Sequence, residues 1–143
     1  MKRILSVLFA LVVVVTTTST VYAQCSNATL TGSYAFSTPG FTTTGRGTVV
    51  GHEDPFAAMG VLAFDGAGSI SISYTFAFRG VISPGLTSSG TYTVNSDCTG
   101  SISFTTGDAA GLNLNTAIIG GGTELFGIIT TPTFTANFDA KKQ

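Results

Sequence analysis

The sequence predicts an all-β protein, an antiparallel up-and-down barrel of about eight strands. Large apolar side chains alternate with Ser and Thr along most of the chain, and turn-forming Gly, Asn, Asp and Pro residues divide it at short intervals. After the N-terminal segment, no stretch has the apolar period of about 3.6 residues that marks a helix. Short loops between strands make consecutive strands antiparallel neighbours.

The first 23 residues have the pattern of a secretory signal peptide. Residues 1–3 carry two basic side chains, residues 4–15 are apolar apart from Ser6, and residues 21–23 end in the small residue that signal peptidase requires. The apolar run is too short for a membrane span, which needs roughly 20 residues. We expect cleavage between Ala23 and Gln24, and a secreted or periplasmic protein.

The alternation is clearest in four stretches. In each of them, large apolar residues take every second position and small polar residues the positions between, which puts the two kinds of side chain on opposite faces of a sheet. β-branched and aromatic residues also fit a pleated, half-buried surface. The four stretches are residues 29–36, 69–78, 101–105 and 133–139.

Turn segments separate the predicted strands. Gly, Asn and Asp supply the positive φ angles of tight hairpin turns, whereas Pro fixes φ and donates no backbone hydrogen bond. The breaks fall at residues 39–40, 51–55, 65–68, 83–85, 95–100, 107–111, 120–122 and 131–132. Counting between them gives about eight or nine strands.

One hairpin pattern occurs twice, in residues 60–78 and 90–105. Each copy is a strand, a turn rich in Asp, Asn or Gly, and a second strand that restarts with Gly-Ser-Ile-Ser. A sheet with one apolar face hides that face by closing into a barrel or by folding into a two-layer sandwich. Long, evenly spaced strands without a helix-length crossover favour the barrel, with the aromatic residues inside. A Greek-key β-sandwich is the alternative.

Cleavage of the signal peptide from the 143-residue chain leaves a single β-barrel domain, residues 24–143, with four basic and seven acidic residues and a formal charge of −3. Such a chain has too few cations to neutralise a row of phosphates, so nucleic-acid binding is not expected. The same scarcity argues against docking on anionic membranes. We expect no membrane insertion after cleavage.

Two cysteines, Cys25 and Cys98, remain in the mature chain. In an exported chain, two cysteines most simply form one disulfide, and only one connectivity exists. The sequence has no Cys-x-x-Cys pair and only one His, which argues against a redox or metal role. The bond is expected to tie the N-terminus to the turn of the second hairpin.

The only dense polar cluster is residues 51–55, Gly-His-Glu-Asp-Pro, with Arg46 shortly before it. His52 titrates near neutral pH and stands beside two carboxylates, which suits acid–base chemistry. The alternative is a solvated loop with a turn-forming Asp-Pro. No second His completes a metal site, so neither a metal nor a cofactor is predicted.

Glu124 is a second candidate for acid–base chemistry. It has the same parity as Phe126 and Ile128 along its predicted strand, so we expect its side chain to lean toward the apolar face. A carboxylate at the mouth of a barrel would orient a ligand or act as a base. The alternative is a side chain that bends to solvent at the end of the strand.

Aromatic residues dominate the predicted apolar faces, which hold Tyr34, Tyr74, Tyr92 and ten phenylalanines. Two interpretations are open. The rings line a cavity for a small apolar ligand, or they fill the barrel themselves, as side chains do at about eight strands. In the first interpretation, the ligand-binding residues are Tyr34, Tyr74, Phe76, Tyr92, Phe104 and Phe126.

Residues 25–34 (CSNATLTGSY), 64–69 (FDGAGS) and 90–100 (GTYTVNSDCTG), together with the terminal residues 141–143 (KKQ), resemble an uncharacterised family of small secreted bacterial β proteins rich in Gly, Ser and Thr. The resemblance implies export and brings no catalytic residues with it. The inferred shape is similar to lipocalin-like and allene-oxide-cyclase-like barrels, which is a likeness of architecture and does not settle function.

Three functions follow, in order of preference. The first is a secreted, non-enzymatic barrel that binds a small apolar ligand in an aromatic-lined interior. The second is a structural surface or matrix protein with a packed barrel, whose Ser/Thr face mediates assembly. The third is an enzyme, a cyclase or isomerase of the allene-oxide-cyclase type, in which Glu124 or His52 moves a proton.

Overall fold

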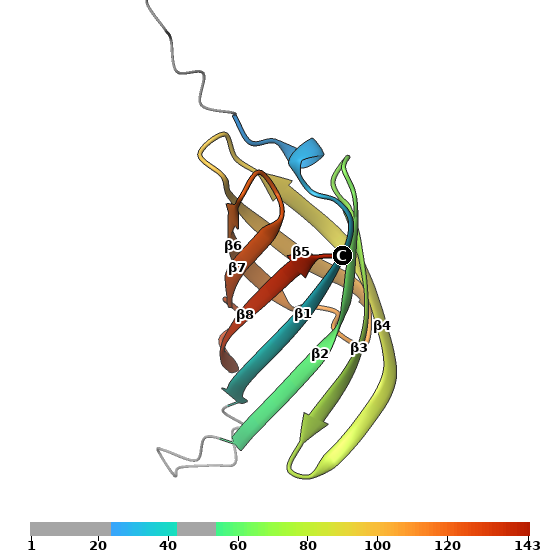
Figure 1. The fold of residues 1–143 in the computed structure, drawn as a ribbon. Coiled ribbons are helices and arrows are strands. Elements are labelled where there is room, and N and C mark those ends of the chain that lie inside the picture. The colour runs from blue at the N-terminus through green and yellow to red at the C-terminus, as the bar shows by residue number, and fades with distance from the viewer. Residues whose placement is uncertain (1–23, 43–53) are drawn as a thin grey trace, which may run out of the picture.

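The computed structural model describes residues 24–42 and 54–143 of the chain. This part forms a closed barrel of eight antiparallel strands in the order of the sequence, and β1 closes it by pairing with β8 (Figure 1). The strands are β1 (Thr31–Thr42), β2 (Asp54–Asp65), β3 (Ser69–Phe78), β4 (Val81–Val94), β5 (Thr99–Gly107), β6 (Asn113–Ile119), β7 (Glu124–Ile129) and β8 (Phe134–Lys142). The barrel prediction is confirmed and the sandwich alternative is wrong. The predicted signal peptide lies outside the described residues.

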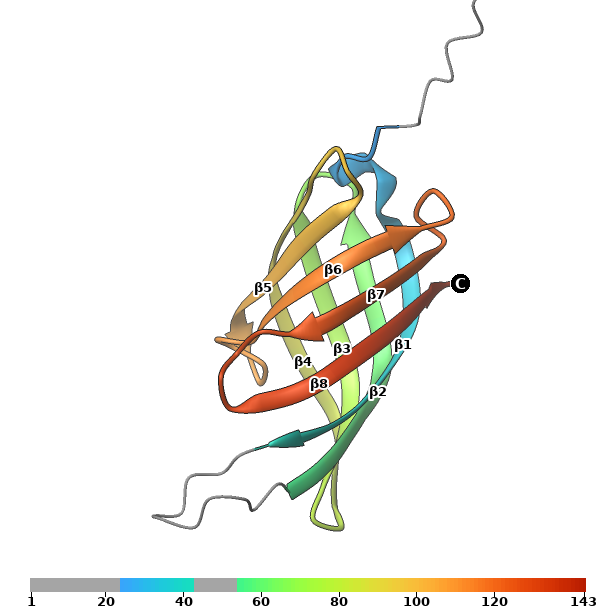
Figure 2. The ribbon, with the colours of Figure 1, turned by 90° about the vertical axis from the view of Figure 1, so that its left-hand side faces the viewer.

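The barrel has two different ends. One end carries the turns β2–β3, β4–β5 and β6–β7 and the N-terminal segment with its short 3₁₀ helix η1 (Asn27–Thr29), at the top of Figure 1. We call it the capped end. The other end carries the connections β3–β4, β5–β6 and β7–β8, which are seen from the side in Figure 2. We call it the cavity end, for the reason given below.

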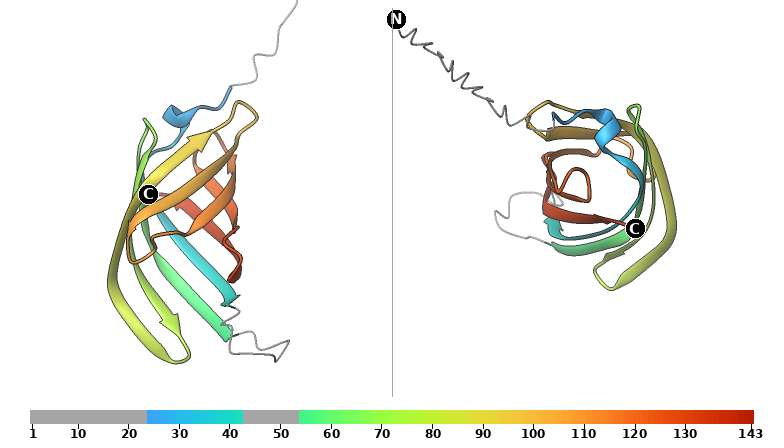
Figure 3. Two further views of the ribbon diagram at one scale, coloured as in Figure 1. Left: turned by 180° about the vertical axis from the view of Figure 1, so that it is seen from behind. Right: turned by 45° about the horizontal axis from the view of Figure 1, so that its top comes forward.

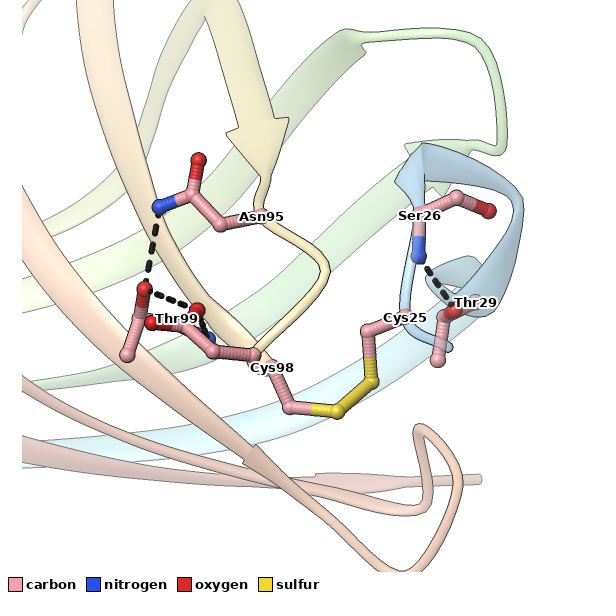
Figure 4. Close-up of a disulfide and its surroundings, with 7 residues drawn as sticks. Cys25, Ser26, Thr29, Asn95, Cys98 and Thr99 are labelled. Atoms are coloured by element: carbon pink, nitrogen blue, oxygen red, sulfur yellow. Dashed lines mark hydrogen bonds between the residues drawn. A yellow bond between two sulfur atoms is a disulfide. The ribbon is translucent and has the colours of Figure 1, made fainter. Parts of the chain in front are cut away.

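The predicted disulfide holds the N-terminal segment against the capped end of the barrel. Cys25 and Cys98 are bonded with their Cα atoms 5.0 Å apart, joining the segment just before η1 to the β4–β5 turn (Figure 4). The side chain of Asn27 fixes the segment to β4 and to the β2–β3 turn, because its Oδ1 accepts from the backbone N–H of Val94 and its Nδ2 donates to the carbonyl of Ala67. Figure 3 shows this segment lying at the rim of the barrel.

The capped half of the barrel is filled by side chains. Leu30 is inserted from the N-terminal segment and is buried beneath η1. Three rings pack edge to face behind it, with ring centres 5.2 Å apart for Tyr34–Phe64 and 5.0 Å apart for Phe64–Tyr92. The Tyr92 hydroxyl donates to the carbonyls of Asn27 and Leu30 at 3.0 and 3.1 Å, and the Tyr34 hydroxyl donates to the carbonyl of Gly122. Aromatic packing and satisfied hydroxyls leave no room for a ligand here.

The pairing between β4 and β5 does not extend to the cavity end. β4 pairs with β5 only from Ser88 onward, so residues 81–87 pair with β3 alone and extend that hairpin beyond its neighbours (Figure 1). Pro84 lacks a backbone donor, and Gly85 has φ +73° at an interruption of the β3–β4 register. Both features protect a free strand edge against pairing with another strand.

The outer surface is divided by residue type. Over β3, β4 and β5 it carries the Ser and Thr residues that the alternation predicted, such as Ser71, Thr91 and Ser101, which are exposed. Over β1, β2 and β7 it carries large apolar side chains as well, and further exposed ones stand at the start of β4 (Val81, Ile82) and the end of β6 (Ile119). Phe41, Met59, Phe126 and Ile128 are 46%, 65%, 41% and 54% exposed.

Candidate functional site

A cavity of about 470 Å³ occupies the half of the barrel opposite the N-terminal segment. Its floor is formed by mid-strand aliphatic residues that include Leu62 and Ile102, and its walls by the strand ends and the β5–β6 loop. Seven aromatic side chains line it: Phe36, Phe56, Tyr74, Phe76, Phe104, Phe134 and Phe138. The volume falls in the range of about 300–1,000 Å³ that is typical of small-molecule sites.

The residue sizes explain why one half of the barrel is packed and the other is hollow. At the cavity end, an inward position on β2 holds the small residue Ala58, which lines the cavity. Residues 81–87 of β4 do not pair with β5, and Leu86 is the residue of this part that lines the cavity. The aromatic rings therefore form a wall around the cavity instead of a plug.

The aromatic wall is held by ring–ring packing. The ring of Phe56 lies 5.5 Å from that of Phe76 and 5.6 Å from that of Phe134, the latter edge to face. Phe76 stacks on Phe78 at 6.2 Å, which continues the aromatic row toward the tip of the β3–β4 hairpin. Such pairs stabilise beyond the area they bury, so the wall is rigid on the side formed by β2, β3 and β8.

Asp108 is the charged residue among the described residues that line the cavity. Its carboxylate Oδ2 accepts from the backbone N–H of Thr87 at 2.9 Å, and its own N–H donates to the carbonyl of Thr87 at 2.9 Å. The neighbouring N–H of Ala109 donates to Ser88 Oγ at 2.6 Å. These bonds fix the β5–β6 loop against the first residues of β4 that reach β5, so the carboxylate is held in place at the cavity.

Tyr74 is the second polar group with a defined role in the lining. Burial raises the pKa of its hydroxyl, and the negative charge of Asp108 raises that pKa further. The phenol is therefore neutral at physiological pH and available both to donate and to accept a hydrogen bond. Besides Tyr74 and Asp108, the polar side chains of the described lining are those of Thr38, Thr131 and Thr133, and the other lining residues are apolar.

The rim beside the β3–β4 hairpin carries an ion pair. The guanidinium of Arg79 pairs with the carboxylate of Asp54 and lies 5.2 Å from the ring centre of Phe78. Arg79 has φ +50° and is followed by Gly80 with φ +80°, the combination that a two-residue hairpin turn of type I′ requires. The Arg79 side chain is 50% exposed.

Three of the six predicted ligand-binding residues, Tyr74, Phe76 and Phe104, line this cavity. Tyr34 and Tyr92 lie in the packed capped half instead, where their hydroxyls are bonded to backbone carbonyls. The structure therefore brings together half of the predicted set and leaves the other half away from the cavity.

Phe126 and Glu124 lie on the outer face of β7, so their predicted inward orientation is wrong. Leu125 is 0% exposed and Ile129 is buried, which makes the odd-numbered positions of this strand the inward ones. Glu124 forms an ion pair with Lys141, with Oε1 3.0 Å from Nζ, near the capped end. β7 carries apolar residues on both faces, so parity within this strand did not identify the inner one.

The residues that the sequence analysis missed include Phe36, Phe56, Phe134, Phe138 and Asp108. The phenylalanines share strand parity with the predicted set. The missing information was which end of each strand lies away from the disulfide. Because Cys25 caps one end, aromatic residues far from Cys98 along the strands are the ones left beside an unfilled space. Asp108 gave no such signal, since it stands in a turn.

His52 and Arg46 lie outside the described residues. Within residues 24–42 and 54–143, no three His, Cys, Asp or Glu side chains come together as a metal site would require. Among the same residues, no helix is long and apolar enough to cross a membrane.

Comparison with known proteins gives no match. No protein-family model, no curated protein and no solved structure matches this chain. The resemblance to small secreted bacterial proteins, and the likeness to lipocalin-like and allene-oxide-cyclase-like barrels, stay predictions. The function is argued below from the geometry of the cavity.

Proposed function

We propose that the protein is a secreted, non-enzymatic barrel that binds a small apolar ligand in the cavity between Phe56 and Phe104. The observation that carries this proposal is the contrast between the two halves of one barrel. The capped half is packed with rings and sealed by a disulfide, whereas the other half holds a cavity of about 470 Å³ lined by seven aromatic side chains.

The hydrophobic effect favours an apolar occupant. Removing apolar surface from water stabilises a complex by roughly 25 cal/mol per Å², and both the ligand and the exposed rings of the lining contribute to this term. The rigid aromatic wall adds to affinity, because little ordering of side chains is needed on binding. The described lining contains one carboxylate and no His, Cys or Lys, and its side-chain hydroxyls are those of Tyr74, Thr38, Thr131 and Thr133. It therefore lacks a Ser–His or Cys–His pair of a nucleophile and its base, which supports a binding role.

Export is supported by two features of the chain. The first 23 residues have the signal-peptide pattern, and the Cys25–Cys98 disulfide is of the kind that persists in oxidising compartments. The ligand is then a molecule met outside the cytoplasm.

The direct test is native mass spectrometry of the protein purified from its own secretion route. We expect an extra mass that leaves on denaturation. A second measurement uses N-phenyl-1-naphthylamine, a neutral apolar fluorophore whose emission rises in a dry site. The chain has no Trp, so background emission is low. We expect saturable binding with one site per barrel.

A pair of neighbouring alanines provides the matched control. Ala58 lines the cavity, whereas Ala57 is exposed on the outer face of the same strand. Ala58→Leu should fill part of the cavity and weaken binding of the fluorophore at least about fivefold, and Ala57→Leu should leave it unchanged. Equal binding by both variants, or a bare chain that takes up no fluorophore, would contradict the proposal.

A second candidate, a surface or matrix protein that self-associates, is favoured by the apolar outer face. Phe41, Met59, Phe126 and Ile128 together expose about 400 Å² if each large side chain has roughly 200 Å² in full. β8 lies between β7 and β1 and presents the exposed polar residues Thr135 and Asn137, so the four side chains belong to a mixed surface. Its apolar area is of the size that is often functional on a monomer. The occupant that we infer is a second copy of this chain, seated on this apolar face and not on the Ser/Thr face.

Sedimentation velocity at several protein concentrations tests this candidate. We expect a concentration-dependent shift to dimer that Ile128→Lys abolishes. Ser101→Lys, on the Ser/Thr face of β5, is the control and should leave the shift intact. A monomer at all concentrations would remove the second candidate without affecting the first.

A further inference from the structure

We propose that the ligand is a hydrophobic amine, with its apolar body against the phenylalanine wall and its protonated nitrogen between Asp108 and Tyr74. This inference rests on the proposed function, since it names the chemical class that the same cavity selects. Three observations carry it: the single carboxylate of the described lining, the aromatic side chains of the same lining, and the contacts of Arg79 with Asp54 and Phe78.

The carboxylate of Asp108 is the reason to expect a cation. One of its oxygens, Oδ2, accepts a single backbone hydrogen bond from Thr87, and a carboxylate has about four lone-pair positions to offer. The β5–β6 loop fixes the group at the wall of an apolar cavity. Asp108 itself is exposed, so its attraction for an ammonium is that of a charge near a protein surface, which is stronger than in bulk water and weaker than in a buried site. A ligand without a positive charge gains no affinity from the Asp108 carboxylate.

The aromatic surroundings favour the same charge. Tyr74 and Phe76 line the cavity on β3, and Phe104 lines it on β5, the strand that leads into the Asp108 loop. The face of an aromatic ring attracts a cation that lies within about 6 Å of its centre. The neutral hydroxyl of Tyr74 accepts a hydrogen bond from an ammonium, which gives the nitrogen a second polar partner.

An anionic ligand fits this site poorly. The described lining contains no Lys, Arg or His that would neutralise a carboxylate, and Asp108 repels one. Arg79 at the rim is paired with Asp54 and lies over Phe78, so recruiting it would break two existing contacts. A neutral alcohol is accommodated by the same wall but gains nothing from the charge of Asp108. The order of affinity expected for one apolar body is therefore amine, then alcohol, then carboxylate.

Three naphthalene derivatives of nearly equal size test this order. They are 2-naphthylmethylamine, 2-naphthylmethanol and 2-naphthoate, each used to displace N-phenyl-1-naphthylamine from the full mature protein. We expect the amine to displace the fluorophore at a concentration at least about tenfold lower than the alcohol requires, with the carboxylate weakest. The advantage of the amine should shrink at high salt, because part of it is electrostatic.

Variants at position 108 separate charge from structure. Asp108→Asn keeps an oxygen that accepts from Thr87 N–H, so the loop is expected to hold, but the charge is lost. The preference for the amine over the alcohol should then fall to within about twofold, while the affinity for the alcohol stays the same. Asp108→Glu should retain the preference. Asp97→Asn, in the β4–β5 turn at the capped end, is the control and should change neither affinity.

Each outcome decides something. Equal displacement by the three derivatives, or tightest binding of the carboxylate, overturns the amine inference and leaves the apolar cavity standing. Retention of the amine preference in Asp108→Asn also overturns it. If none of the derivatives displaces the bound fluorophore, the inference fails while the proposed function holds. If the fluorophore itself does not bind, the proposed function fails.

Discussion

Phe138 occupies the space that a side chain at Gly127 would need. The two residues are direct partners on the neighbouring strands β8 and β7. A Cβ atom at Gly127 would overlap Cε1 of Phe138 and approach the carbonyl oxygen of Asn115 to 2.7 Å. The absence of a side chain lets the buried ring lie flat across β7, where it forms part of the cavity wall. Gly127 thus helps to set the shape of the cavity.

Gly127→Ala should therefore affect both stability and binding. The added methyl group pushes the Phe138 ring toward the cavity, and overpacking of this kind typically costs about 1–3 kcal/mol. We expect a lower urea midpoint and weaker binding of N-phenyl-1-naphthylamine. The double variant Gly127→Ala with Phe138→Leu relieves the overlap with the ring, so its free energy of unfolding should exceed the value that the two single changes predict by addition. Strict additivity would contradict the packing relationship.

Tyr92→Phe tests the seal of the capped end. The change removes a hydroxyl that donates to the carbonyls of Asn27 and Leu30; the Asn27 carbonyl still accepts from the backbone N–H of Leu30, whereas the buried Leu30 carbonyl loses this donor. We expect a loss of about 1–2 kcal/mol in the free energy of unfolding, measured by urea titration, with unchanged binding of the fluorophore at the far end. Tyr74→Phe is the matched control and should change stability by less than about 0.5 kcal/mol. An equal loss in the free energy of unfolding for both variants would show that the hydrogen bonds of the Tyr92 hydroxyl stabilise the protein no more than the Tyr74 hydroxyl does.

The sequence predicted the fold well because alternation and turn chemistry are local properties. The two Gly-Ser-Ile-Ser segments lie where strands begin: Gly68 directly precedes β3, and Gly100 is the second residue of β5. The predicted disulfide is also present. The site was harder to predict because a barrel has two ends, and strand parity does not say which end is filled. Tyr34 and Phe36 have the same parity on β1, yet one is in the packed half and the other lines the cavity.

β7 shows a second reason for the errors. Its segment Leu125-Phe126-Gly127-Ile128-Ile129 is apolar on both faces, and its central inward position has no side chain. Periodicity therefore gave no signal, and only pairing with β6 and β8 decides that Leu125 faces inward. The apolar outer residues that result, Phe126 and Ile128, form part of the exposed apolar face.

Reduction of the Cys25–Cys98 disulfide should destabilise the whole barrel. The bond closes a loop with a sequence separation of 73 residues, and a loop of this length corresponds to about 4 kcal/mol in the chain-entropy model, with about 2–4 kcal/mol usual in practice. We expect urea titrations with and without reductant to differ by that amount. The Cys25→Ala, Cys98→Ala double variant should match the reduced protein and should not respond to reductant. Bound fluorophore should be retained as long as the barrel is folded.

Asp65 should make stability depend on pH in the acid range. Its Oδ1 accepts from the backbone N–H groups of Ala67, Gly68 and Ser69 at 2.8–2.9 Å, in the turn between β2 and β3. These bonds, first that from Ala67, lower the pKa of the carboxyl from 3.8 to about 2. A carboxyl whose pKa is lower in the folded state contributes stability that is complete above the unfolded value and is lost as the pH falls through the folded value.

The stability advantage of the parent protein over Asp65→Asn should therefore be constant above about pH 4 and should decline between about pH 4 and pH 2. The Asn side chain offers an oxygen to the same three N–H groups but does not titrate, so the variant isolates the charge. Urea midpoints measured from pH 6 to pH 2 give the comparison. Ser71→Ala, an exposed position on the adjoining strand, is the control, and its difference from the parent should not vary with pH. A difference for Asp65→Asn that stays constant down to pH 2 would mean that its carboxylate does not stabilise the β2–β3 turn through these bonds.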